Sequence, residues 1–189
     1  MTVNGFRHLG DRRVHQGHIW HVAVAEFEAP DGERFERDIV RSPGAVGVVP
    51  LRFDEHGVPR VVLVSQYRPP FDEMVVEVPA GMRDVPGEPT ELTASRELAE
   101  EVGLAADTYE HLLDMYPSAG MTDSVLTLYL ATGLRDVGRE THGPEEAHMD
   151  VLDLTLAEAV EMLVRGEIHD AKTVIGLLLV ERRLRQRGS

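Results

Sequence analysis

The chain has no cysteine, and this absence excludes a disulfide framework, a thiolate nucleophile and a cysteine-based metal site. It also has no long hydrophobic run, because the longest, residues 174–180, is far shorter than the roughly 20 residues that a membrane-spanning helix needs. The first residues, MTVNGFRHLGDRR, contain no apolar core of the kind found in export signals. We therefore expect a cytoplasmic protein with no membrane partner.

Positive charge is also scarce. Lysine and arginine total 19 against 33 aspartates and glutamates, so the formal net charge is −14. This balance argues against DNA, RNA or an anionic membrane as a partner, because all three would be repelled. A small phosphorylated substrate stays compatible with the charge, since a bound cation reverses the field around it.

Acidic residues are concentrated in residues 81–104, GMRDVPGEPTELTASRELAEEVGL. Helical residues advance by about 100° each, so a helix over this segment would have two different faces. One face carries carboxylates: Glu97, Glu100 and Glu101. The opposite face is apolar and would pack on a core: Leu98, Ala99 and Val102. Thr90 is placed to cap the start of this helix, and Gly103 is placed to end it in a left-handed conformation.

Carboxylates spaced in this way need an explanation, because like charges three or four positions apart destabilise a helix by about 0.2–0.5 kcal/mol per pair. A hard divalent cation reverses that sign, since Mg²⁺ and Mn²⁺ prefer carboxylate oxygen. The alternative is a solvated acidic face without metal. The surrounding order favours the metal, because Arg96 directly precedes Glu97 and Glu88 lies further upstream.

The same residues resemble the Nudix box, G-x5-E-x7-R-E-U-x-E-E-x-G-U, in which U is aliphatic. Every fixed position is filled: Gly81, Glu88, Arg96, Glu97, Leu98, Glu100, Glu101, Gly103 and Leu104. The one departure is an additional residue between Gly81 and Glu88, in the Pro/Gly turn at residues 84–87, where an insertion costs little. The resemblance implies a hydrolase of diphosphates linked to another moiety.

The hydrophobic pattern predicts strands, then a helix, then strands, then helices. We expect a hairpin of residues 18–28 and 34–41 around Pro30-Asp31-Gly32, then strands at 45–53, 60–67, 74–78, 109–115, 125–131 and 148–154. Two helices should follow, 156–165 and 171–187, the second capped by Asp170. This order is typical of an α/β (α+β) architecture. The resemblance implies the Nudix-type α/β/α sandwich with a mixed central sheet, plus N-terminal antiparallel strands.

We expect the chain to have two parts. Residues 1–43 would be an N-terminal strand extension that forms a dimer, because an isolated hairpin is only marginally stable and needs something to pack on. Residues 44–189 would be the Nudix hydrolase domain.

Three flanking segments resemble the ADP-ribose pyrophosphatase branch of this family: Gln66-Tyr67-Arg68, Glu77-Val78-Pro79-Ala80-Gly81 and Glu145-Glu146-Ala147-His148-Met149. The third is similar to an E-E-A-D-M run of actinobacterial members, with His148 in place of the acid. After the box, residues 120–123 are in register with the branch. Ala119 there replaces its usual proline, and Ser124 replaces an acid that is often present. These departures concern the substrate and leave the reaction class unchanged.

The resemblance also implies a ligand set for Mg²⁺, or for Mn²⁺: Glu97, Glu100, Glu101 and the backbone carbonyl of Ala80. Glu146 is the expected catalytic base, with Glu145 as the second choice. Both end a polar stretch, residues 133–146, and a loop of this length can close over bound substrate. The alternative is that both are solvated loop acids.

The residues expected to bind substrate are Arg68, Glu77, Arg37, Gly120 and Met121. Arg68 would pair with phosphate oxygens or, alternatively, form a surface salt bridge. Arg37 matches a strand arginine that reaches across the dimer to substrate in this family. Trp20 or His18 would stack on adenine, with core packing as an equal alternative for Trp20. The supporting residues are Gly81, Glu88 and Arg96, the last bracing Glu88 or Glu97.

The function that follows from the resemblance is Mg²⁺-dependent hydrolysis of ADP-ribose to AMP and ribose 5-phosphate by a homodimer. Hydrolysis of another nucleoside diphosphate sugar or dinucleotide is the alternative within the same class. A non-catalytic ligand sensor with the Nudix fold is the alternative from a different class. Such sensors often lose box glutamates, whereas this chain retains them all.

Overall fold

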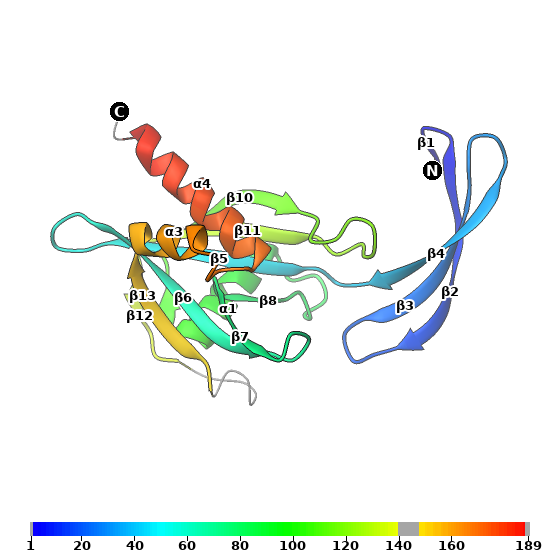
Figure 1. Ribbon diagram of the computed structural model, residues 1–189. Helices are drawn as coiled ribbons and strands as arrows, with labels where there is room; N and C mark the ends of the chain where they lie inside the picture. Colours follow the sequence, from blue (N-terminus) through cyan, green and yellow to red (C-terminus); the bar gives the residue numbers. More distant parts are fainter. Residues whose placement is uncertain (1, 140–147, 188–189) are drawn as a thin grey trace. The chain divides into compact units, whose positions relative to one another are not determined.

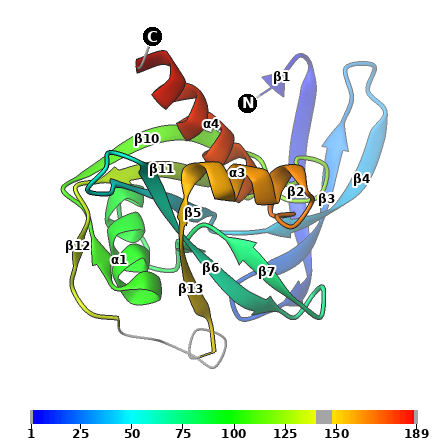
Figure 2. The same cartoon turned by 60° about the vertical axis from the view of Figure 1, so that its left-hand side comes forward.

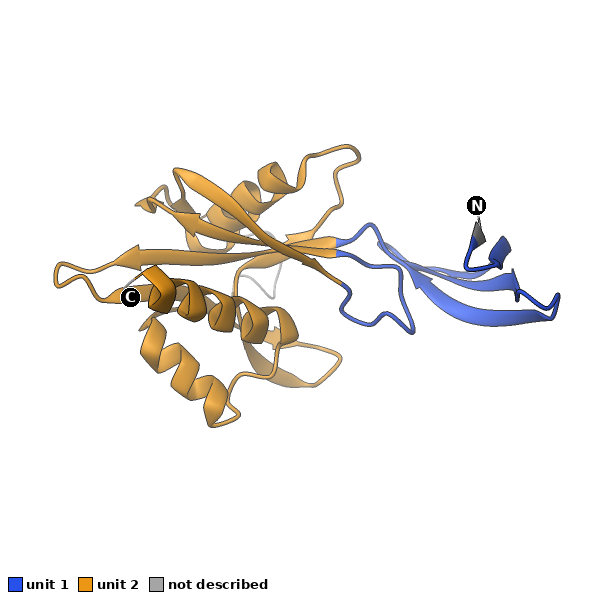
Figure 3. Ribbon diagram, turned by 90° about the horizontal axis from the view of Figure 1, so that it is seen from above, with its two compact units in different colours: residues 1–44, 116–125 blue, residues 45–115, 126–189 orange. Residues whose placement is uncertain are grey.

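The computed structural model describes residues 2–139 and 148–187 (Figure 1). The chain divides into two compact units. Residues 1–44 and 116–125 form unit 1, and residues 45–115 and 126–189 form unit 2 (Figure 3). None of the helices in the described part of the chain is both long and apolar enough to span a bilayer.

Unit 1 is an antiparallel sheet in the order β1-β2-β3-β4. Its strands are β1 (Thr2–Val3), β2 (Phe6–Gln16), β3 (His21–Glu28) and β4 (Arg34–Arg41). The hairpin between β3 and β4 forms as predicted, with Gly32 at φ 89° in the turn. The strand expected from residue 18 begins only at His21, because Gly17 donates a hydrogen bond to the Trp20 carbonyl in a turn. Strand β2 was not predicted, and every side chain along it is exposed.

The segment 116–125 belongs to unit 1 because it is hydrogen-bonded to β4. The Val40 N–H donates to the Met121 carbonyl at 2.9 Å, and the Thr122 hydroxyl donates to the Val40 carbonyl at 2.7 Å. Arg41 holds Asp123 at 3.2 Å and Asp11 of β2 at 2.8 Å. Residues about 80 positions apart are thereby brought together.

Unit 2 contains a mixed sheet in the order β10-β11-β5-β6-β13, with β7 paired to β6 and β8 paired to β5. The pairing of β5 with β11 is parallel and the other described pairings in this sheet are antiparallel, which confirms the mixed sheet. The strands are β5 (Ala45–Phe53), β6 (Pro59–Arg68), β7 (Glu73–Glu77), β8 (Ala80–Met82), β10 (Thr108–Met115), β11 (Leu126–Thr132) and β13 (Asp150–Thr155). A separate short pair joins β9 (Leu104–Ala105) to β12 (Arg135–Asp136).

Helices cover both faces of this sheet (Figure 2). Side chains of a strand alternate between its faces. On β5, Val46 and Val48 pack in one core cluster with Leu98 of α1 (Thr90–Val102), and Val49 packs in the other with Leu177 of α4 (Ala171–Arg187). Helix α3 (Leu156–Val164) lies on the α4 side and begins with a capping box formed by Thr155 and Glu158. The predicted α/β/α sandwich is confirmed.

The ends of α1 and the start of α4 can be compared with the predicted caps. Asp170 accepts a hydrogen bond from the Thr173 N–H at 2.9 Å, so it caps α4 as expected. Gly103 ends α1 in the left-handed region with φ 68°, also as expected. The prediction for Thr90 was wrong, because α1 begins at Thr90 itself and Pro89 occupies the N-cap position. The Thr90 hydroxyl instead lies 2.7 Å from the Tyr129 hydroxyl on β11.

Candidate active site

Strand β8 and helix α1 bring the two ends of the box together. The Ala80 N–H donates a hydrogen bond to the Glu101 carboxylate at 2.9 Å. A Cβ placed on Gly81 would lie 1.9 Å from the carboxyl carbon of Glu97, so only glycine leaves room for this carboxylate. The Glu97 carboxylate can therefore occupy this position only because residue 81 is a glycine.

The carboxylates of α1 are more buried than the helical pattern indicated. Glu97 is 8% exposed and Glu101 is 4% exposed, whereas Ala99 and Val102 on the predicted apolar face are only half-buried. The reason is that β8 covers the acidic side of the helix. The expected separation into a core face and a carboxylate face was thus incomplete, since Glu97 and Glu101 share the buried side with Ala94 and Leu98.

The Arg96 guanidinium forms ion pairs with the carboxylates around the start and the middle of α1. Its Nη1 lies 2.8 Å from Glu97 and 3.1 Å from Glu100. Its Nη2 lies 3.2 Å from Asp84 in the turn after β8 and 3.7 Å from Glu88. Glu88 also accepts a hydrogen bond from the Thr93 hydroxyl at 2.8 Å. The additional residue of the box therefore lies in a turn that Arg96 ties to the helix.

Glu97 is a buried acid of this cluster whose ionised form is disfavoured. Burial raises the pKa of Glu97 to about 7, and the charge of Glu100 adds to this, although Arg96 opposes it. A buried carboxylate whose ionised form is disfavoured gains most from a nearby cation. The site is therefore electrostatically prepared for a positive ion beyond Arg96.

The donor set fits a hard divalent metal, although it is not arranged as a finished site. Among the described residues, no three His, Asp or Glu side chains converge in the geometry of a metal centre. The carboxylates are instead engaged by the Arg96 guanidinium and the Ala80 N–H. Carboxylate and backbone carbonyl oxygens are nevertheless the ligands that Mg²⁺ and Mn²⁺ prefer. Glu97, Glu100, Glu101 and Ala80 fit such an ion.

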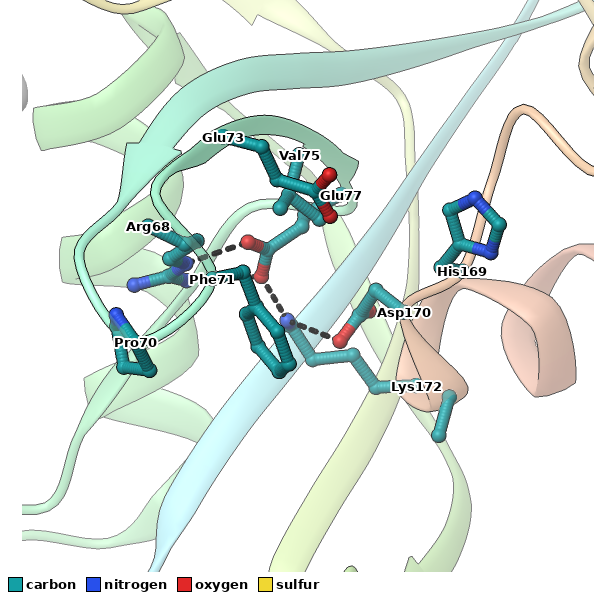
Figure 4. A pocket seen from close by; sticks show the side chains of 10 residues that line it. Arg68, Pro70, Phe71, Glu73, Val75, Glu77, His169, Asp170 and Lys172 are labelled. Atoms are coloured by element: carbon teal, nitrogen blue, oxygen red, sulfur yellow. Dashed lines mark hydrogen bonds and ion pairs between the residues drawn. The ribbon is translucent and has the colours of Figure 1, made fainter.

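Two of the predicted substrate residues, Arg68 and Glu77, line a cavity of about 360 Å³ in unit 2 (Figure 4). The Arg68 guanidinium donates two hydrogen bonds to the Glu77 carboxylate, one of them 2.8 Å long. Sequence reasoning missed three further charged residues of this cavity: Glu73 on β7, and Asp170 and Lys172 at the start of α4. A signal was present, because Lys172 is the single lysine of the chain.

The other three, Arg37, Gly120 and Met121, line a cavity of about 460 Å³ within unit 1. Three aromatic rings share it: Phe6, Phe27 and Phe35. Phe27 and Phe35 are stacked with centroids 5.4 Å apart, and the Arg37 guanidinium lies 4.8 Å from the Phe35 centroid. The structure thus gathers residues that are far apart in the sequence.

Trp20 and His18 do not line this cavity. Trp20 is 53% exposed, so the core-packing alternative for it was wrong. Glu145 and Glu146, the predicted bases, lie outside the residues that the structure describes.

Comparison with known proteins identifies the class. Residues 41–175 match the NUDIX domain family, so the chain belongs to this family. It is 38% identical over 180 residues to an ADP-ribose pyrophosphatase of Mycobacterium tuberculosis, covering 95% of this chain and 85% of the relative. It is 31% identical over 169 residues to an ADP-ribose pyrophosphatase of Bacillus subtilis, covering 89% of each. The crystal structure of an ADP compounds hydrolase has the same fold, with a TM-score of 0.82, 23% identity and coverage of 100% of this chain and 98% of that one.

Proposed function

We propose that this Nudix hydrolase cleaves the diphosphate of ADP-ribose, giving AMP and ribose 5-phosphate. The observation that carries the proposal is the buried carboxylate cluster of Glu97 and Glu101 packed against Ala80 and Gly81. The two ADP-ribose pyrophosphatases similar to this chain over most of its length support the choice of substrate.

Glu97, Glu100, Glu101 and the Ala80 carbonyl would hold Mg²⁺, with Mn²⁺ as the substitute. The bound ion supplies charge neutralisation of the diphosphate and stabilisation of the leaving group. Arg96 balances the remaining carboxylate charge through its ion pairs with Glu97 and Glu100. Arg68 presents its guanidinium to a phosphate oxygen, since Nη1 has no partner among the described residues. Glu146, or else Glu145, orients the attacking water and takes its proton.

The aromatic cavity of unit 1 is our proposed site for the adenine ring. Stacked Phe27 and Phe35 offer a flat apolar surface, and aromatic faces favour offset stacking with other rings. Arg37, above Phe35, adds a positive charge to the same cavity. Gly120 and Met121 complete the wall. This assignment replaces Trp20 and His18 as the stacking residues.

A substrate panel tests the proposed function. ADP-ribose, ADP-glucose, GDP-mannose and NADH would each be incubated with the protein and Mg²⁺, and the products identified by mass. We expect the highest kcat/KM for ADP-ribose, with AMP and ribose 5-phosphate as products. Turnover of ADP-ribose no faster than the others would refute the choice of substrate and favour another nucleoside diphosphate. Binding without turnover of any of them would favour the sensor.

We also propose a cytoplasmic homodimer joined through the N-terminal strands of residues 1–43. Strand β2 supports this, because its apolar side chains Phe6, Leu9 and Val14 are all exposed. Light scattering after size exclusion should give twice the chain mass of 21.0 kDa. Val14→Glu is expected to shift the population toward monomer, because it places a charge on an apolar contact. Gln16→Glu on the same strand is the matched control and should remain dimeric.

A further inference from the structure

Lys172 is a buried charge for which the proposed chemistry has no direct use. It is 7% exposed, and its ammonium contacts the carboxylate of Glu77 and lies 3.0 Å from that of Asp170 (Figure 4). Taking an ammonium ion out of water costs several kcal/mol unless its partners compensate. A buried lysine that contacts two carboxylates therefore indicates that the charge is needed where it lies.

Lys172 forms an ion pair with Glu77. Glu77 is 2% exposed and faces two cations, Arg68 and Lys172. Burial by itself would raise the pKa of Glu77, but the hydrogen bonds of Arg68 and the charge of Lys172 outweigh burial and lower it below its usual range. Glu77 thus stays ionised at neutral pH and can fix Arg68 through both carboxylate oxygens.

The position of Lys172 is fixed by hydrogen bonds of its neighbours in the first turn of α4. The Val78 N–H, one residue after Glu77, donates to the Thr173 hydroxyl at 2.8 Å. That hydroxyl donates to Asp170 at 2.6 Å, the same carboxylate that caps the helix. The end of β7 is therefore joined to α4 at two adjacent positions, by the ion pair of Glu77 and by the hydrogen bond from the Val78 N–H to the Thr173 side chain.

The four charges of this group balance, with Arg68 and Lys172 against Glu77 and Asp170. If Lys172 were neutral, Arg68 would be the only cation facing the Glu77 carboxylate among the residues that the structure describes. The guanidinium would be drawn further into that pair and would have less of its charge available to an incoming anion. In the intact group Arg68 keeps Nη1 free of described partners on the wall of the cavity.

We propose that Lys172 is a positioning residue, which shares the charge of Glu77 so that Arg68 is held ready to bind a phosphate oxygen of the substrate. The proposal rests on the proposed function only in that the substrate is a diphosphate. It assigns a role in substrate binding to the first turn of α4, on the face of the sheet opposite to the box helix α1.

Kinetics of Lys172→Met test the proposal. We expect KM for ADP-ribose to rise about tenfold, the effect of weakening one charge-assisted hydrogen bond, with kcat nearly unchanged. Leu177→Ala is the matched control, because it removes a fully buried side chain from the same helix away from the cavity. It should lower Tm without raising KM. An unaltered KM in Lys172→Met, or an equal rise in Leu177→Ala, would overturn the proposal.

A second measurement uses the wild-type chain and applies even if Lys172→Met does not fold. Because Lys172 is the single lysine, ¹⁵N-lysine labelling gives one side-chain Nζ signal in NMR. Imidodiphosphate with Mg²⁺, at concentrations that inhibit hydrolysis, should shift this signal, and Arg68→Ala should abolish the shift. A signal that does not move while imidodiphosphate inhibits contradicts the proposal.

Failure of the proposed function can be distinguished from failure of the proposal for Lys172. If ADP-ribose is a poor substrate for the wild type, the kinetic comparison is made with the diphosphate that the panel selects. The NMR experiment needs no knowledge of the substrate, since its probe carries only the two phosphates. The role of Lys172 can therefore be refuted while ADP-ribose hydrolysis stands, and the reverse also holds.

Discussion

Glu97→Gln is expected to lower kcat for ADP-ribose by about 100- to 1,000-fold, because the change removes a proposed metal ligand and with it several kcal/mol of transition-state stabilisation. The same change should make the metal-free protein more stable at pH 8. The stability effect originates in the burial of a carboxylate that has too little positive charge around it.

The sign of the stability effect follows from the pKa of Glu97. Its folded value of about 7 lies above the ordinary value of 4.5, so the unfolded chain loses this proton at lower pH than the folded one. The resulting destabilisation is absent below about pH 4.5, grows as the pH rises toward 7 and is complete above it, reaching about 3 kcal/mol. Glutamine carries no charge and removes this cost.

Thermal unfolding in EDTA at pH 5 and pH 8 measures the difference. We expect the Tm of Glu97→Gln to exceed that of the wild type at pH 8 and to approach it at pH 5. Added Mg²⁺ should then raise the Tm of the wild type more than that of the variant, since only the wild type retains the full ligand set. Glu91→Gln is the matched control, because it makes the same change at an exposed position of α1. It should leave kcat and both Tm values unchanged.

Two outcomes would contradict this account of Glu97. Full turnover in Glu97→Gln, with the metal requirement intact, would show that the box is not the catalytic centre. A wild-type stability that does not fall between pH 5 and pH 8 relative to the variant would show that the carboxylate is adequately compensated without metal. Glu101→Gln provides an independent check of the first point, since Glu101 is equally buried but also accepts the Ala80 N–H.

The fold could be predicted where apolar runs and turn residues mark the elements clearly. Strands β4 and β5 and helix α4 begin and end at the predicted residues. Strand β5 is a nearly continuous apolar run that is buried along most of its length, and glycine or proline turns bound both strands. Strand β2 shows the opposite case. Its charged and polar residues lie on both faces, so its backbone pairing with the neighbouring strands β1 and β3 makes it a strand. A prediction from side-chain pattern cannot detect a strand without a buried face.

The sequence predicts which residues form the candidate site, but it does not predict how deeply they are buried or what they contact. A helical projection places Glu97 and Glu101 on one side of α1, but only the path of β8 shows that this side is buried. Arg37 and Met121 were chosen from separate segments, and the bonding of the 116–125 loop to β4 places them in one cavity. Lys172 was missed because its role depends on a contact with a strand end 95 positions away in the chain.

Glu146→Gln is the second change with a large expected effect. A positioned general base contributes about 100- to 10,000-fold, so kcat should fall within that range. KM for ADP-ribose should change little, because the base acts on water and not on the bound diphosphate. The acid limb of the pH–kcat profile, where the base becomes protonated, should disappear with it. This effect is separable from that of Glu97→Gln, since the Mg²⁺-induced rise in Tm should be retained.

Glu145→Gln is the matched control, one residue away and with the same change of charge. We expect it to retain most of the wild-type kcat. A large loss in Glu145→Gln together with near-normal turnover in Glu146→Gln would transfer the role of base to Glu145. Near-normal turnover in both variants would exclude this acidic pair. The water would then be activated within the carboxylate cluster of α1, where Glu100 is a half-buried glutamate held by Arg96 at 3.1 Å.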